Sequence, residues 1–197
     1  MSLNITQLSS TPVEGAAYKS NLSAYKGSVF GGTEYGKFNG FVSLDNWMYS
    51  YTPANGTLQV WKENDEDIRY EIFTSIFSIS EISFTFDKQM LPVASYMQNK
   101  LCYIYFFDSS LNNYNTLNIP NAISPRVALS SIHFSHAQDS EVVLGYVTEN
   151  KKLCIRLQKD RYSIEYPIKV FDKKIKLYNI GYSNKNRFQY EVLESSV

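Results

Sequence analysis

Residues 92–107 read PVASYMQNKLCYIYFF, in which two runs of aromatic and β-branched side chains flank the polar turn Gln98-Asn99-Lys100. Such runs fit the pleated, half-buried surface of a β-sheet, and a short polar turn between them is typical of a hairpin. The second run, Leu101–Phe107, is apolar on both faces. It therefore predicts a strand that lies between two layers of sheet.

Hairpins of the same layout recur along the chain. A tyrosine closes the first strand of each, at Tyr51, Tyr96, Tyr146 and Tyr182, with separations of 45, 50 and 36 residues. A repeat of about this length, with about four strands per unit, is what a β-propeller blade requires, because each blade buries its faces only against its neighbours. The sequence therefore predicts an all-β fold, a small or incomplete β-propeller-like domain of about four hairpin or blade units. A β-sandwich with similar aromatic hairpins is the alternative.

The ends of the repeat region set the expected domain organisation. Residues 1–25 carry Ser, Thr, Asn, Pro and Gly without apolar periodicity and predict an N-terminal arm or leader, followed by a single all-β propeller-like domain over 26–197. The clearest turn inside it is Asn55-Gly56, which supplies the positive φ angles of a tight hairpin between Tyr51 and Leu58. The short last interval indicates an incomplete final blade, and an open arc exposes sheet edges that we expect a partner or the arm to cover.

Composition excludes several classes of partner. Lys plus Arg and Asp plus Glu each number 19, so the formal net charge is zero and no basic surplus exists to bind nucleic acid or an anionic membrane surface. No apolar stretch approaches the roughly 20 residues that span a bilayer. The start lacks the layout of a secretory signal, so we expect synthesis in the cytoplasm. The two cysteines, Cys102 and Cys154, are expected to be buried strand thiols.

Metal and catalytic signals are weak. His133, His136 and Asp139 could form part of a metal site, but on a strand the two imidazoles point to opposite faces, so a solvated loop is expected. The acidic run Glu63–Asp67 lacks the glycine and distal glutamate of a calcium loop. No serine lies in a Gly-x-Ser-x-Gly elbow, so we expect no enzyme activity, no cofactor and no metal. Paired glycosidase carboxylates from distant strands remain an open alternative.

Two groups of residues are candidates for binding. The densest group of tyrosine and tryptophan residues could stack on sugar rings, although core packing also accounts for most of it. Its members are Trp47, Tyr49, Tyr51 and Trp61. Arg126 follows Ser124-Pro125, and Arg161 follows Asp160, so each guanidinium is expected to pair with a carboxylate and act as an interface residue between blades or subunits.

A series of motifs runs from Ile79 to about Tyr166. They are Ile82-Ser83-Phe84-Thr85-Phe86-Asp87, Pro92–Tyr96, Tyr103–Asp108, Ser124–Leu129, Asp139–Tyr146 and Leu157–Tyr162, and the earlier Phe38–Phe41 and Gly56–Leu58 also fit. Through these motifs the chain resembles virion structural proteins of tailed bacteriophages, particularly proteins of the tail. It departs from the pattern after Phe86-Asp87, where Lys88-Gln89-Met90 replaces a turn glycine. The resemblance implies a structural component of the virus particle and transfers no catalytic residues.

Together these features predict a non-enzymatic, tail-associated virion protein that acts as a scaffold or adaptor. Its expected partners are other virion proteins, in multiple copies of a symmetric assembly, and its expected location is the virion tail. The alternative is a carbohydrate-binding module of a tail fibre or receptor-binding complex that recognises a host-surface glycan.

Overall fold

The computed structural model describes residues 5–7, 26–31, 45–52, 56–62, 65–75, 79–87, 89, 91–130, 141–182 and 187–194. Within these residues the chain is nearly all β-strand, apart from the 3-10 turn η2 (Gln158–Asp160). None of the described residues belongs to a helix with the length and apolar character needed to cross a membrane.

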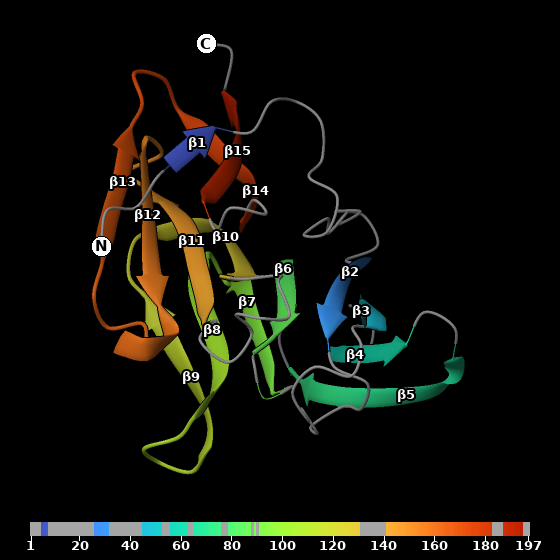
Figure 1. Ribbon diagram of the computed structural model, residues 1–197. Coiled ribbons are helices and arrows are strands. Elements are labelled where there is room, and N and C mark those ends of the chain that lie inside the picture. The colour runs from blue at the N-terminus through green and yellow to red at the C-terminus, as the bar shows by residue number, and fades with distance from the viewer. Residues whose placement is uncertain are drawn as a thin grey trace.

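Four sheets follow one another along the chain (Figure 1). Sheet 1 contains β2 (Lys26–Gly31), β3 (Asp45–Thr52), β4 (Thr57–Lys62) and β5 (Asp65–Thr74). Sheet 2 contains β6 (Ile79–Phe86), β7 (Pro92–Gln98), β8 (Leu101–Asp108) and β9 (Asn113–Ile119). Sheet 3 contains β10 (Ala122–Leu129), β11 (Val142–Thr148), β12 (Lys152–Leu157) and β13 (Tyr166–Val170). Sheet 4 contains β14 (Ile175–Tyr182), β15 (Phe188–Glu194) and β1 (Ile5–Gln7), which pairs parallel to β15.

Local sequence explains the hairpins. Between β7 and β8, Asn99 and Lys100 both have positive φ angles, 51° and 65°, and such a two-residue turn matches the twist of the flanking strands. The predicted hairpin between Tyr51 and Leu58 is present, because these residues face each other in β3 and β4. Gly56 has a φ of +69°, and a Cβ atom there would lie 1.9 Å from the carbonyl oxygen of Ser75, so only glycine fits.

The hydrophobic core lies between consecutive sheets, in three clusters. The cluster between sheets 1 and 2 consists of Tyr49, Tyr51, Leu58, Val60, Ile79, Ile82, Phe84, Phe86, Ala94 and Tyr96. The cluster between sheets 2 and 3 consists of Val93, Met97, Cys102, Ile104, Phe106, Ile119, Ala122, Val127, Val142, Leu144, Tyr146, Cys154 and Tyr162. The cluster between sheets 3 and 4 consists of Ala128, Val143, Val147, Leu153, Ile155, Phe171, Ile175, Leu177, Ile180, Tyr182, Phe188 and Tyr190. Each sheet therefore buries its apolar side chains against the next sheet along the chain.

The first strands of the sheets meet at the centre of the molecule. β2 contacts β6, β6 contacts β10 and β10 contacts β14, whereas β5, β9 and β13 form the outer edges (Figure 1). This is the arrangement of propeller blades, in which each unit packs on its neighbours. The prediction of an all-β fold with about four blade-like units is confirmed, and the four predicted hairpins do not share a single pair of facing sheets.

Tyr182 closes the first strand of the hairpin β14–β15, as predicted, but its equivalence to the other three tyrosines is wrong. Tyr51, Tyr96 and Tyr146 lie in the second strands of their sheets, but Tyr182 lies in β14, the first strand of sheet 4. The tyrosine in the second strand of sheet 4 is Tyr190, 44 residues after Tyr146. The interval of 36 residues therefore came from comparing different strands, because both β14 and β15 carry a buried tyrosine.

Candidate functional site

Arg126 is a large and fully buried charged side chain. It lies in β10, and only 1% of it is exposed. Ser124 has a positive φ of 51°, and the pairing of β10 with β11 shifts register between Ile123 and Arg126. Such a bulge bends a strand and redirects the following side chain. The bulge at Ser124-Pro125 thus directs the side chain of Arg126 toward its partners.

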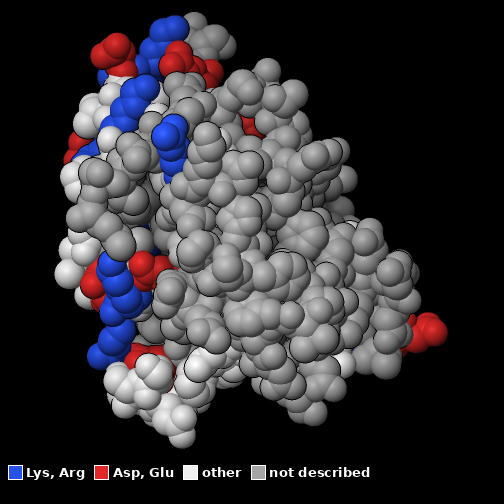
Figure 2. Space-filling model, in the orientation of Figure 1, with Lys and Arg blue, Asp and Glu red and all other residues white. Residues whose placement is uncertain are grey.

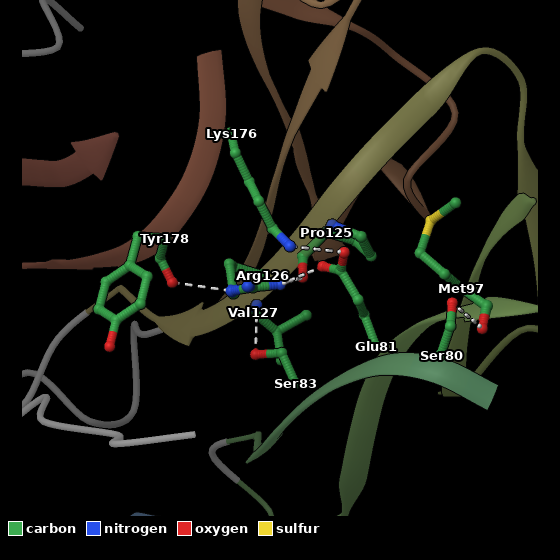
Figure 3. A network of polar contacts seen from close by, with 9 residues as sticks. All are labelled: Ser80, Glu81, Ser83, Met97, Pro125, Arg126, Val127, Lys176 and Tyr178. Carbon is green, nitrogen blue, oxygen red and sulfur yellow. Dashed lines mark hydrogen bonds and ion pairs between the residues drawn. The ribbon is translucent and has the colours of Figure 1, made fainter. Parts of the chain in front are cut away.

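Arg126 joins three sheets. Its Nε donates to the backbone oxygen of Tyr178 in β14 at 2.8 Å, and its Nη1 donates to the Glu81 carboxylate in β6 at 3.2 Å (Figure 3). The same Nη1 lies 2.7 Å from the Pro125 carbonyl oxygen. Lys176 of β14 reaches the other oxygen of Glu81 at 3.0 Å. We call Arg126, Glu81, Lys176 and Tyr178 the axial network, because its members come from the first strands of sheets 2, 3 and 4.

A neighbouring contact strengthens the same junction. The amide of Val127 in β10 donates to the buried Ser83 hydroxyl of β6 at 3.1 Å (Figure 3). A buried guanidinium is costly unless a carboxylate and further acceptors satisfy it. In the axial network Arg126 has both, so the arrangement holds the sheets in place and presents no reactive group.

A second link joins sheets 2 and 3 away from the centre. Arg161, after η2, donates from Nε to the carboxylate of Asp108 at 3.0 Å, and its Nη2 contacts the same oxygen. The other carboxylate oxygen of Asp108 accepts the hydroxyl of Ser110 at 2.7 Å and its amide at 3.0 Å. Asp108 is buried, whereas the Arg161 side chain is 55% exposed. The hydrogen bonds from Ser110 and Arg161 hold the pKa of the Asp108 carboxyl below its usual value, although burial opposes this.

Asp87 repeats this arrangement at the same end of sheet 2. One carboxylate oxygen of Asp87 accepts the amides of Gln89 at 2.8 Å and Leu91 at 3.0 Å, which closes the turn after β6. The other oxygen accepts the side-chain amide of Gln158 in η2 at 3.0 Å. Each aspartate thus closes its own turn with one oxygen and fastens sheet 3 with the other. Both follow a phenylalanine at a strand end, so the repeated Phe-Asp pair is the sequence signal of this role.

The two cysteines are poor nucleophiles. Both are free and buried in the cluster between sheets 2 and 3. Burial raises the pKa of the Cys102 thiol to about 12 and that of Cys154 to about 11. A nucleophilic cysteine needs a thiolate at neutral pH, so we expect both thiols to be unreactive in the folded protein.

The described part of the chain contains no group of three or more His, Cys, Asp or Glu side chains that could hold a metal ion. His133, His136 and Asp139, considered above as metal ligands, lie outside the described residues. In the acidic run, Glu63 also lies outside them, and Asp67 is exposed at the start of β5.

Three of the four predicted sugar-stacking residues, Tyr49, Tyr51 and Trp61, belong to the core. Tyr49, Tyr51 and Trp61 are 0%, 1% and 6% exposed, and the Trp47 side chain lies outside the described part of the structure. Tyr49 packs on Phe84 of sheet 2, with ring centroids 5.5 Å apart. The prediction of a glycan-binding face is therefore wrong for Tyr49, Tyr51 and Trp61, which are buried, and core packing, the other interpretation given above, accounts for them.

Charges of both signs are interleaved on the surface. Figure 2 shows blue and red side chains side by side along the flank where Figure 1 places β12 and β13. Lys152 pairs with Glu165 at 2.9 Å, and Lys159 pairs with Glu141 at 3.7 Å. Among the described residues of that flank, positive and negative side chains thus alternate.

The axial network, the two aspartate links and the buried thiols all serve contacts between sheets. In comparisons with known proteins, no family model, no curated protein and no solved structure matches this chain.

Proposed function

We propose that this chain is a non-enzymatic structural protein of a bacteriophage tail, a scaffold or adaptor that acts through protein–protein contacts. The observation that carries the proposal is the axial network, in which Arg126 fastens three consecutive sheets. The most deeply buried charge of the described chain is thus used to hold sheets together. A protein whose sheets are fastened to one another in this way is suited to holding bound partner proteins at fixed positions rather than to catalysis.

The chemistry of the described residues supports the non-enzymatic part. The Cys102 and Cys154 thiols are buried with raised pKa values. The guanidinium of Arg126 is engaged by Glu81 and two carbonyl oxygens. The virion assignment is supported by the resemblance of the motifs between Ile79 and Tyr166 to tail proteins.

Assembly would use the outer edges of the sheets. β5, β9 and β13 each end a sheet, and an edge strand offers backbone donors and acceptors to a strand from another protein. The chain itself shows this mode of contact, because β1 adds to sheet 4 by pairing with β15 on the side away from β14. Many copies around a symmetric tail would multiply individually weak contacts.

The test is to purify tailed virus particles whose genome encodes this chain and to quantify the proteins of the particles by mass spectrometry. We expect the chain to remain with intact particles through a density gradient, at a fixed ratio to the other tail proteins. Immunogold labelling is expected to place it on the tail. Recovery only in the soluble lysate, with particles that lack it, contradicts the proposal.

A glycan-binding module is the second candidate. Its support is the half-buried Tyr103 of β8, which stacks on Tyr96 with ring centroids 5.5 Å apart and an interplanar angle of 24°. A flat tyrosine face can stack on a sugar ring. Binding on a glycan array that is lost in Tyr103→Ala but kept in Trp61→Phe would favour this candidate over the scaffold.

A further inference from the structure

The outer edge of sheet 2 differs in charge from the other outer edges. Residues 109–125, which include all of β9, contain no Asp, Glu, Lys or Arg. β5 carries acidic and basic residues between Asp65 and Glu71, and β13 carries Pro167 and Lys169. Charges and proline are the usual means by which proteins keep edge strands from pairing with other chains. β9 lacks both.

The backbone of β9 is prepared for another strand. The amide of Tyr114 donates to the side-chain oxygen of Asn113, and the amide of Thr116 donates to that of Asn115, both at 2.8 Å. Alternate amides of an antiparallel edge strand face away from its neighbour, so these two amides and that of Asn118 face outward from β8. Two outward donors are therefore held by asparagine side chains at the surface, which can rotate away when a backbone acceptor arrives.

We propose that two copies of this chain pair antiparallel along β9, about a two-fold axis at Thr116. In this register Thr116 lies opposite Thr116 of the partner subunit, and Tyr114 lies opposite Asn118 of the partner subunit. All outward amides of β9 then find backbone acceptors, and sheet 2 continues from one copy into the next. This inference rests on the proposed function, because the dimer would be one contact within the larger tail assembly.

The absence of charge favours a second copy as the occupant. A two-fold axis places each residue near its own equivalent, so a charged strand would repel itself, as β5 would with its acidic residues. Uncharged β9 has no such repulsion, and a threonine pair is among the favourable cross-strand pairs. The zero net charge of the whole chain also leaves little repulsion between copies.

The experiment measures the mass of the purified full chain by light scattering and sedimentation over a concentration series. The wild-type chain is expected to form a dimer. Thr116 is exposed and its side chain hydrogen-bonds Tyr96, so Thr116→Lys and Thr116→Glu lose this one contact and should still fold. Each places like charges across the axis and should weaken dimerisation by about tenfold or more. An equimolar mixture of the two variants should recover the dimer, because Lys then faces Glu.

The matched control is Val170→Lys, which adds the same charge to the 70% exposed end of the edge strand β13 and should leave the dimer unchanged. Mixing the two variants would not repair a folding defect. Recovery of the dimer in the mixture therefore shows that the single variants lose the pairing along β9 and not the fold. A monomeric wild-type chain, or variants that dimerise as well as the wild type, overturns the inference. Either result leaves the proposed function standing if the chain still travels with purified tails.

Discussion

Arg126 shows how a single side chain can define the junction of three sheets. Its guanidinium reaches a carbonyl oxygen 52 residues later and a carboxylate 45 residues earlier in the chain. Hydrogen bonds to a buried charge contribute more than neutral ones, because both partners have given up water. The same geometry explains why lysine is a poor substitute, since one ammonium group cannot meet acceptors on both sides.

Replacement of Arg126 by methionine should therefore destabilise the protein. We expect Arg126→Met to lower the free energy of unfolding by about 3 kcal/mol, from the lost charged hydrogen bonds and imperfect packing, while Glu81 keeps Lys176 as a partner. Urea denaturation followed by circular dichroism measures it. Lys159→Met is the control, because that side chain is 58% exposed and its loss should cost under about 0.5 kcal/mol. Equal effects of the two substitutions would show that the axial network contributes no more to the free energy of unfolding than an exposed ion pair does.

Asp108 makes stability depend on pH. Its pKa is lower in the folded protein than in the unfolded chain, so its contribution is present above the unfolded pKa of about 3.9 and is lost as the pH falls through the folded value. Asp108→Asn should lower the urea midpoint at neutral pH, and its difference from wild type should shrink in acid. Asp172→Asn, at an exposed position, should change the midpoint little throughout. A difference for Asp108→Asn that is constant from neutral to acid pH would exclude this mechanism.

The roles of individual residues were only partly predictable from the sequence. Arg126 and Arg161 could be identified as candidates, because each guanidinium follows a distinctive neighbour, Ser124-Pro125 or Asp160, and is expected to pair with a carboxylate. Their partners Glu81 and Asp108 were not predictable, because those contacts form only after separate sheets have stacked. For Tyr49 and Trp61 the sequence left core packing and sugar stacking both open, since an aromatic residue has the same local pattern whether its strand faces another sheet or solvent.

Gly145 controls how closely two strands approach. It lies in β11, and a Cβ atom added there would meet Ile180 atoms at 3.0 and 3.2 Å and a Leu177 methyl at 3.3 Å. The backbone of sheet 3 at Gly145 therefore packs directly against the Ile180 and Leu177 side chains of sheet 4. Overpacking of a filled core forces side chains and backbone to shift.

Gly145→Val should lower the free energy of unfolding by about 2 kcal/mol. The double variant Gly145→Val with Ile180→Ala should lose less than the sum of the two single variants, because the shortened Ile180 leaves room for the new methyl groups. Chemical denaturation of all four proteins gives the coupling free energy. Strict additivity would mean that the two residues do not touch in solution.

Among the strands, the hairpins were predictable and their grouping into sheets was partly so. The turns at Asn99-Lys100 and Gly56 depend on local backbone angles, which residue type indicates directly. The assignment of Tyr182 failed because a buried tyrosine marks a strand but not its order within a sheet. Tyr190, in the second strand of sheet 4, restores an interval close to the others.

The whole molecule is a series of sheets, each dependent on the next for its core. The spacing of the aromatic hairpins was enough to predict this, because a unit of about 45 residues cannot bury both faces of its sheet alone. The sequence analysis expected the N-terminal arm or a partner to cover an open sheet edge, and β1 covers β15 in this way. The choice of β15 was not predictable, since Ile5–Gln7 has no distinctive pattern and its partner lies at the other end of the chain.

The reactivity of the two thiols tests the stacking of consecutive sheets most directly. Cys102 of sheet 2 and Cys154 of sheet 3 lie in the cluster that joins these sheets, and both are at most 1% exposed. We predict that neither reacts with a chromogenic disulfide reagent in the native protein, and that both react at the rate of global unfolding as urea is raised. Rapid labelling of either thiol under native conditions would contradict the account, because it would mean that sheets 2 and 3 do not bury each other's faces.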